Sequence, residues 1–177
     1  MIKSRFNISD ILPNNIIGCE LGVFEGDFSD VLINTGKFSK LYLVDLFDGL
    51  VESGDTHGNN IKVKSGLELQ ELVINRFLKD DRIIISKNDS ISFLSSFDDE
   101  YFDFVYIDTS HQYEHTKAEL ELAFKKVKTG GIIAGHDYNE YQFYGVVSAV
   151  NEFSLLKNLP INLTSEDRLE TFYFFKK

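Results

Sequence analysis

Two clusters of polar side chains stand directly after two short apolar runs in the second half of the chain. Asp108 and His111 follow the run 102–107, and His136 and Asp137 follow the next run. Such runs are typical of strands that are buried on both faces of a sheet. Carboxylates can hold a hard cation such as Mg²⁺, and a histidine can accept a proton from a hydroxyl near neutral pH. The clusters therefore carry the residue types for metal-assisted or general-base chemistry.

A helical segment should connect these two runs. Leu120, Phe124 and Val127 recur at helical spacing, so this apolar line is expected to face the sheet. Gly130 and Gly131 are expected to end the helix as a C-cap. A strand, a crossover helix and a second strand of this length form a parallel βαβ unit. Both polar clusters should then emerge at the carboxyl edge of one sheet, where open α/β folds bind their ligands.

The convergence of these strands gives each polar residue a candidate role. Neighbouring strands lie about 5 Å apart, so Asp108 and Asp137 are expected to hold Mg²⁺ between them. In the alternative, Asp108 serves a cofactor and Asp137 caps the next segment. His111 is the candidate general base, whereas His115, one helical turn later, should be exposed. His136 is open to three roles: metal ligand, second base or structural neighbour of Asp137.

A second candidate site follows the first apolar run of the chain, residues 16–21. Glu20, Gly22 and Gly26 stand at the turn between this run and a helix expected over about 27–34. Glycines at such a turn let the backbone bend tightly and approach a ligand closely. The dinucleotide fingerprint G-x-G-x-x-G is missing, and a carboxylate at Glu20 suits an ammonium or sulfonium better than a pyrophosphate. The turn is either a cofactor site or an ordinary strand-to-helix turn.

Two further strand ends carry residues that suit a nucleoside. Asp45 ends the run 40–46 and can accept hydrogen bonds from both hydroxyls of a ribose, with Asp48 as a rival. Asp89 and Ser90 follow the run 82–86 and can contact an adenine edge or cap the next helix. The two roles of Asp89 and Ser90 are compatible with each other.

The order of these patterns indicates the fold class. Strand and helix patterns alternate about five times, and further helices are expected over 65–79, 91–97 and 145–156. Residues 47–64 are expected to form a long polar loop. The segments 160–163 and 169–175 should form a closing hairpin with an antiparallel last strand. We expect one domain, residues 1–177, of the α/β class: a doubly wound, mostly parallel, seven-stranded sheet with an antiparallel C-terminal hairpin.

Composition disfavours several classes of function. Hydrophobic residues make up 43% of the chain, and no apolar run approaches the roughly 20 residues of a membrane span, so no membrane partner is expected. The net charge of −10 argues against a nucleic-acid partner, which needs clustered Lys and Arg. The N-terminus lacks the apolar region of a signal peptide, and a single cysteine fits a reducing compartment. A cytoplasmic location is therefore expected.

On these motifs, the chain resembles the class I S-adenosylmethionine-dependent methyltransferases, which have a Rossmann-like fold. The turn from Glu20 to Gly26 corresponds to motif I of that family, Asp45 to its ribose-binding acid, and Asp89 with Ser90 to its adenine-contact position. The segments Y-I-D-T-S-H-Q-Y-E and G-G-I-I-A-G-H-D-Y are similar to a subgroup that includes sugar O-methyltransferases and cephalosporin-hydroxylase-like proteins.

The resemblance implies roles for the second pair of motifs. In metal-dependent relatives, the acid of the I-D-x-x-H motif and the acids before the final tyrosine bind Mg²⁺, and the histidine of the motif is the base. Carried over, Asp108 and Asp137 are metal ligands and His111 is the base. His136 replaces one of the two acids often present in relatives, and it joins the expected ligand set. The lid insertions of larger relatives are missing, so the acceptor site is either open or completed by a second subunit of a homodimer.

The function implied by the resemblance is transfer of a methyl group from S-adenosylmethionine to a hydroxyl of a small molecule, with a sugar or glycan precursor as the acceptor. Transfer would be direct and in line, and His111 would make the acceptor oxygen nucleophilic with or without Mg²⁺. Two alternatives stay open. One is a module that binds S-adenosylmethionine without catalysis. The other is a nicotinamide-dependent oxidoreductase, against which the missing fingerprint glycine and Glu20 both count.

Overall fold

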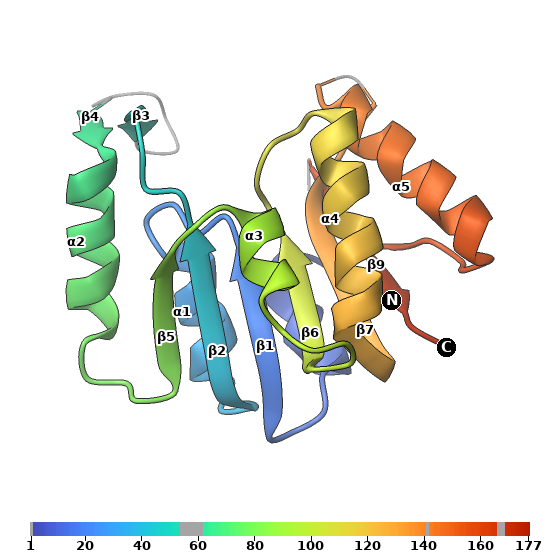
Figure 1. Ribbon diagram of the computed structural model, residues 1–177, viewed down its shortest axis with the longest axis horizontal. Helices are drawn as coiled ribbons and strands as arrows, with labels where there is room; N and C mark the ends of the chain where they lie inside the picture. The colour runs from blue at the N-terminus through green and yellow to red at the C-terminus, as the bar shows by residue number, and fades with distance from the viewer. Residues whose placement is uncertain (1, 54–61, 141, 166–168) are drawn as a thin grey trace.

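The computed structural model describes residues 2–53, 62–140, 142–165 and 169–177, which form a central sheet covered by helices on both faces (Figure 1). Its seven strands are, in spatial order, β5 (Ile83–Lys87), β2 (Phe38–Asp45), β1 (Ile16–Leu21), β6 (Phe102–Ile107), β7 (Val127–Tyr138), β9 (Glu170–Phe175) and β8 (Asn162–Leu163). The first five are parallel, and β9 is antiparallel to both β7 and β8. The expected fold class is confirmed.

Two layers of helices enclose the sheet. One face carries the 3₁₀ helix η1 (Arg5–Ile11), α1 (Asp27–Asn34) and α2 (Gly66–Phe77), and the other carries α3 (Ser90–Ser95), α4 (Tyr113–Lys126) and α5 (Tyr144–Lys157). Successive residues of β2 alternate between them: Leu41 and Leu43 pack in the first layer, Tyr42 and Val44 in the second. Because both faces are buried, the strands are continuous apolar runs. No helix in the described ranges has the length and apolar character needed to cross a bilayer.

Local sequence sets the start of two helices. Ser65 caps α2 in a capping box, in which its side chain accepts from the Glu68 N–H and the Glu68 carboxylate accepts from the Ser65 N–H. Asp89 caps α3 by accepting from the Ser92 N–H at 2.9 Å. The predicted capping role is therefore confirmed for Asp89, whereas Ser90 is the first residue of α3.

The predicted end of α4 is wrong. The helix stops at Lys126, and Gly130 and Gly131 lie inside β7, where Gly130 has φ +84°. Val127, expected on the helix, is fully buried and pairs with Phe102 of β6. Burial of this valine in the sheet and its ladder contact outweigh the local glycine signal, because tertiary packing routinely overrides propensity. Of the predicted apolar line, Leu120 alone is fully buried in the helix, with Phe124 only half-buried.

The expected polar loop over 47–64 is also partly wrong. Its ends pair as a two-stranded antiparallel ribbon, β3 (Leu50–Ser53) with β4 (Lys62–Ser65). The middle of the expected loop, 54–61, lies outside the described residues. In Figure 1 this ribbon stands above α2, at the edge of the sheet where the strand arrows end.

The strand order places a ligand site at one position. The chain adds β2 and then β5 on one side of β1, and β6 and β7 on its other side. Open α/β sheets bind ligands at the carboxyl ends of the two strands where this direction reverses. Here those strands are β1 and β6, so the residues that follow Leu21 and Ile107 should line the site.

Candidate active site

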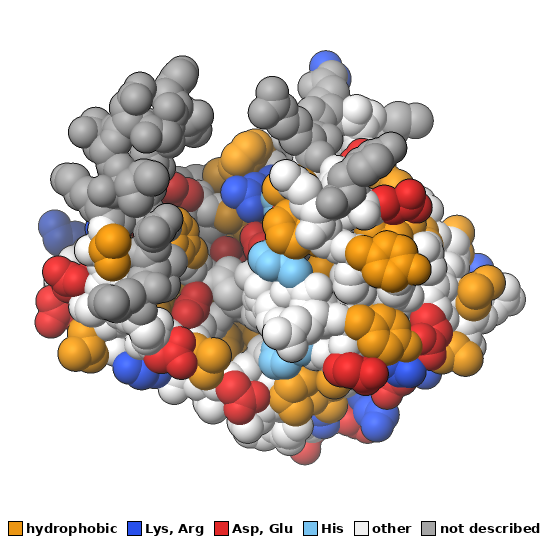
Figure 2. Space-filling model, turned by 90° about the horizontal axis from the view of Figure 1, so that it is seen from above, with side chains coloured by type: hydrophobic (Ala, Val, Ile, Leu, Met, Phe, Trp, Pro, Cys, Tyr) orange, Lys and Arg blue, Asp and Glu red, His pale blue; other side chains and the backbone are white. Residues whose placement is uncertain are grey.

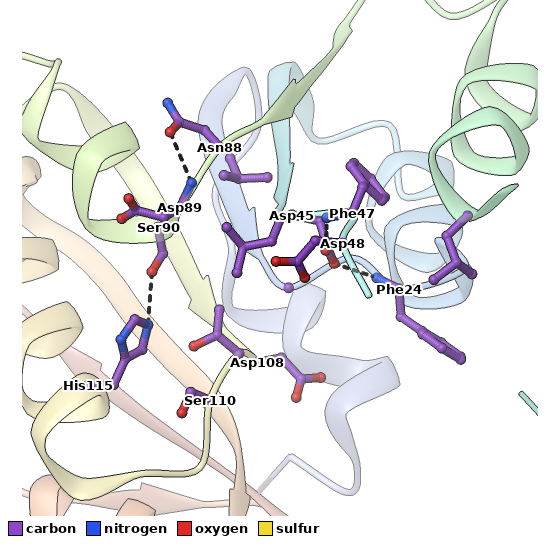
Figure 3. Close-up of a pocket in the computed structure, with 15 residues that line it drawn as sticks. Phe24, Asp45, Phe47, Asp48, Asn88, Asp89, Ser90, Asp108, Ser110 and His115 are labelled. Atoms are coloured by element: carbon purple, nitrogen blue, oxygen red, sulfur yellow. Dashed lines mark hydrogen bonds between the residues drawn. The ribbon is translucent and has the colours of Figure 1, made fainter. Parts of the chain in front are cut away.

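A cavity of about 290 Å³ opens at this carboxyl edge. Figure 2 looks down on the edge and shows acidic side chains bordering a central hollow. One wall is apolar and includes Val44, Phe47 and Leu69. Of the predicted cofactor-binding residues, the following line the cavity: Gly22, Asp45, Asp89, Ser90 and Asp108 (Figure 3). The structure therefore brings together residues from the ends of four different strands.

At Gly22, the turn after β1 lies directly against the backbone of Asp108, which follows β6. It has φ +86°, and a Cβ atom at this position would lie 1.9 Å from the carbonyl oxygen of Asp108. The neighbouring ladder is tight, because the Asp108 N–H donates to the carbonyl of Leu21 at 2.8 Å. A side chain would therefore force β1 and the loop after β6 apart. The glycine in the first turn is required by this contact and by its backbone conformation.

Asp45 both lines the cavity and holds the first turn in place. Its carboxylate accepts from the N–H groups of Val23 at 2.8 Å, Phe24 at 3.0 Å and Phe47 at 2.9 Å. A carboxylate has about four acceptor sites, so these bonds leave room for roughly one ligand hydroxyl. Asp48, the rival, is exposed and also lines the cavity. The ribose role of Asp45 stays a prediction.

Glu20 and Gly26, also predicted to bind a cofactor, do not belong to the cavity lining. Gly26 starts α1 with φ +82° and packs against Phe77. Glu20 is 2% exposed, and its Oε2 accepts from the Ser29 hydroxyl at 2.5 Å. Both residues support the first turn on the side away from the cavity lining, where they contact α1 and α2. They would therefore influence a bound ligand only indirectly.

Burial raises the pKa of Glu20 from the ordinary 4.5 to about 8. The folded state therefore keeps a proton that the unfolded chain loses above pH 4.5, and this stabilisation is lost as the pH rises through 8. We expect Glu20→Gln to remove a decline in the free energy of unfolding of up to about 1.4 kcal/mol per pH unit between pH 5 and 8. Urea unfolding across this range would measure it, with exposed Glu71→Gln on α2 as the charge-matched control. Parallel pH curves for wild type and Glu20→Gln would contradict the expectation.

His111 and Asp137 form a hydrogen-bonded pair beside the cavity. The Nε2 atom of His111 lies 2.7 Å from Oδ2 of Asp137, and the imidazole stacks on the Phe143 ring at a centroid distance of 4.1 Å. Asp137 has φ +61° and lies in an irregular stretch of the β7–β9 ladder between Gly135 and Tyr138. A bulge of this kind redirects a side chain. It brings Asp137 to a histidine from the neighbouring loop, which fixes the imidazole on two sides.

In this pair, each side chain stabilises the charged form of the other. Its hydrogen bond to Asp137 raises the pKa of His111. Burial acts to raise the pKa of Asp137, but hydrogen bonds from His111 and His136 hold it well below its usual value. At neutral pH the Asp137 carboxylate is therefore ionised and orients the imidazole.

Asp108 lies between this pair and the cavity. It lines both the main cavity and a small one of about 10 Å³, which also includes His111 and Asp137. Nη1 of Arg5, in η1, lies 3.3 Å from Oδ2 of Asp108. No sequence pattern predicted this contact. Burial, with a contribution from the nearby Asp137 charge, raises the pKa of Asp108 to about 6. Asp108 therefore lies between the main cavity and the His111–Asp137 pair.

The arrangement could also hold a cation. Asp108, His111 and Asp137 each offer one ligand atom within 4.8 Å of the others, and within the described ranges no other such group of histidine, cysteine and carboxylate side chains is found. The prediction that Asp108 and Asp137 converge is confirmed. The third member is His111. The predicted ligand His136 instead donates from Nδ1 to Oδ1 of Asp137 at 3.1 Å, and its side chain is 12% exposed. The placement of His136 favours its role as a structural neighbour of Asp137.

His115 contradicts the expectation that it is exposed. It is half-buried and lines the main cavity, with Nε2 3.2 Å from the Ser90 hydroxyl and 3.2 Å from Oε1 of Glu119. Glu119 is fully buried on α4, and its hydrogen bond raises the pKa of His115. The sequence signal was the i, i+4 spacing of these two residues, which places them on one helix face.

The fold and the position of the cavity are those of open α/β proteins, which bind ligands at the switch point of the sheet. A family model described as a methyltransferase domain matches residues 19–138. The chain therefore belongs to the methyltransferase domain family, with the Rossmann-like fold of class I methyltransferases. Among proteins of curated function, no sequence match was found.

Solved structures share the fold at low sequence identity. The N-methyltransferase NodS from Bradyrhizobium japonicum, in complex with S-adenosyl-L-homocysteine, aligns with a TM-score of 0.64 and 13% identity over 97% of this chain and 82% of that one. An rRNA methylase from Streptococcus thermophilus aligns with a TM-score of 0.66 and 14% identity, over 99% of this chain and 98% of that one. Spermidine synthase from Thermotoga maritima aligns with a TM-score of 0.64 and 14% identity, over 94% of this chain and 55% of that one. Because these proteins differ in their named reactions, they support the fold and not a particular acceptor.

Proposed function

We propose that this protein transfers a methyl group from S-adenosylmethionine to a hydroxyl of a small acceptor, with His111 as general base. The observation that carries the proposal is the continuity of two sites. The main cavity, with Gly22, Asp45 and Ser90 at its strand ends, shares the loop from Asp108 to Ser110 with the small cavity of the His111–Asp137 pair. A donor bound in the first would lie beside a base in the second.

The cavity supports S-adenosylmethionine as the donor. Its volume lies near the lower end of the range for small-molecule sites. It combines an apolar wall for a base with Asp45 and Asp48, which can accept from ribose hydroxyls. Four carboxylates line it, from Asp45, Asp48, Asp89 and Asp108, which suit a ligand with a sulfonium and an ammonium group. A nicotinamide dinucleotide, with its negative pyrophosphate, fits these charges poorly.

The hydrogen bond between His111 and Asp137 determines how the imidazole would act. A carboxylate only accepts, so Nε2 carries the proton of this bond. Nδ1 is then the nitrogen that takes the proton of the acceptor hydroxyl. Asp137 holds the ring in this tautomer and stabilises the imidazolium that forms, as a buried carboxylate does in other histidine-dependent enzymes.

A magnesium ion is a second element of the proposal. The two carboxylates of Asp108 and Asp137 are ligands that Mg²⁺ prefers, and the small cavity has room for about one water-sized species. When bound, the ion would lower the pKa of an acceptor hydroxyl. His111 would then contribute a ligand nitrogen or stay a base, but Nε2 cannot serve both the ion and Asp137.

The nature of the acceptor is the least constrained part. The net charge of −10 disfavours a polyanionic substrate such as RNA. A neutral hydroxyl compound, for which the resemblance suggests a sugar or glycan precursor, meets no such repulsion. The hollow above the sheet is open at the carboxyl edge, which is compatible with an exposed acceptor site or one that a second subunit covers.

Calorimetric titration of S-adenosylhomocysteine into the purified protein tests the donor. A Kd of about 1 μM, or roughly 8 kcal/mol, is expected. Absence of binding would overturn the proposal. A separate titration with MgCl₂ tests the ion: binding that Asp108→Asn abolishes and Asp10→Asn, on the exposed side of η1, retains would support the ligand set. No magnesium heat in wild type would leave His111 as a metal-independent base.

A further inference from the structure

The sheet ends on one side at β5, a strand with three consecutive isoleucines. These residues, Ile83, Ile84 and Ile85, are only partly buried, and Ile84 is 38% exposed. Within the described ranges, β2 is the strand that pairs with β5, and the outer side of β5 has no neighbour. An apolar strand edge readily pairs with another chain, and most proteins protect such an edge with charges, proline or a covering segment. The outer edge of β5 is therefore a candidate contact surface.

The backbone of β5 directs hydrogen-bonding groups away from the sheet along this edge. The carbonyl of Arg82 accepts from the N–H of Leu41 in β2. Because successive residues of a strand direct their backbone groups to opposite sides, even-numbered residues of β5 bond to β2. The backbone groups of Ile85 and Lys87 point outward, and in the part of the chain that the structure describes they have no partner. They could pair with a strand added to this edge.

The charges at the two ends of β5 are complementary to each other. Asp81 precedes the strand and Lys87 ends it, so they lie at equal distances along the chain from Ile84. Both are exposed, and no ion pair is found for either among the described residues. If two copies of β5 pair antiparallel about Ile84, Asp81 of each copy lies opposite Lys87 of the other. Opposite charges at such positions stabilise strand pairing.

α2 extends the apolar surface beyond the edge of the sheet. On one side of this helix, Arg76 binds two acidic residues of α1. At about 100° per residue, Leu67, Ile74 and Leu78 lie on roughly the opposite side, and all three are exposed. Figure 1 shows α2 beside β5 on one flank of the molecule, with α1 closer to the middle of the sheet. The apolar side of α2 therefore faces in the direction in which an added strand would extend the sheet.

We propose that the outer edge of β5 is a homodimer interface, in which a second copy of this chain adds its own β5 in antiparallel orientation about a two-fold axis at Ile84. Such an interface uses the same surface of both subunits and closes on itself. The two α2 helices would lie on the same face of the joined sheet, with their apolar sides toward each other. Because the paired strands are antiparallel, the carboxyl edges of the two subunits would face opposite directions, and the two cavities would stay separate.

Analytical ultracentrifugation of the purified protein tests this interface. Wild type should sediment with about twice the 20.3 kDa mass of one chain. Lys87→Glu places two carboxylates opposite each other at both ends of the paired strands, and Asp81→Lys places two lysines there. Each change should weaken association about 5- to 500-fold. Lys125→Glu, exposed on α4, makes the same charge change as Lys87→Glu away from β5 and should associate like wild type.

A mixture of the two charge variants gives the sharper test. Lys87→Glu and Asp81→Lys carry complementary charges on each other's strands, so the mixture should form a heterodimer at a concentration where neither variant forms a homodimer. Recovery of the dimer would also show that both variants are folded. A wild type that stays monomeric, a dimer that both charge variants leave intact, or a mixture that stays monomeric would each overturn the inference.

Discussion

Replacement of His111 with alanine should lower turnover by about 100- to 10,000-fold and leave the affinity for S-adenosylhomocysteine unchanged. The variant removes the imidazole nitrogen that the proposal assigns to the acceptor proton, on a ring that Asp137 and Phe143 hold beside the small cavity. His111 does not line the main cavity, so the donor should not lose a contact. Single-turnover rates together with calorimetry would measure the two quantities separately.

Asp137→Asn is the matched variant for this prediction. An asparagine amide can donate to Nε2, which would move the imidazole proton to Nδ1 and remove the base without removing the ring. We expect a loss of turnover comparable to that of His111→Ala, and a double variant no worse than either single one. A loss of cofactor affinity that parallels the loss of turnover would show that His111 is a structural or cofactor residue.

The same pair of variants distinguishes the base from a metal ligand. If His111 and Asp137 act by holding a cation, a chelator should abolish wild-type turnover, and Asp108→Asn should lose as much activity as His111→Ala. If the pair acts as a base, wild-type turnover should survive the chelator. The short bond between Nε2 and Asp137 Oδ2 favours the second result.

Gly22→Ala should lower the stability of the fold by about 2–5 kcal/mol and abolish binding of S-adenosylhomocysteine. A left-handed backbone costs a non-glycine residue roughly 1–2 kcal/mol, and overpacking typically adds about 1–3 kcal/mol. The new methyl group would lie 1.9 Å from the Asp108 carbonyl oxygen, so the loop that carries Asp108 must move. Urea unfolding and calorimetry would measure both effects.

Gly36→Ala is a close control for that variant. Gly36 also has a positive φ, +70°, but a Cβ atom there would have nothing within 4 Å. It should therefore show the backbone cost alone, with ligand affinity retained. Equal losses of stability in the two variants would mean that the contact between the first turn and the loop after β6 is unimportant.

Much of the fold followed from the sequence because the central strands of the sheet are buried on both faces. Short apolar runs such as 16–21 and 102–107 are typical of such strands, and each is followed directly by a glycine or a carboxylate residue. The same reasoning predicted that Gly22, Asp45, Ser90 and Asp108 would gather at one edge, because parallel strands share their direction. The prediction of helix ends was weaker: the glycines at 130–131 form part of a strand, since burial of Val127 decided the boundary.

The sequence by itself determined the sheet, its carboxyl edge and the types of residue collected there. Only the tertiary structure decided which of them touch. The distortion of β7 at Asp137 turns that carboxylate toward His111, the 3₁₀ helix brings Arg5 to Asp108, and burial of Glu119 draws His115 into the cavity wall. These contacts depend on side-chain direction and on burial between elements far apart in the chain. Local sequence does not contain either quantity, because both arise when the layers pack.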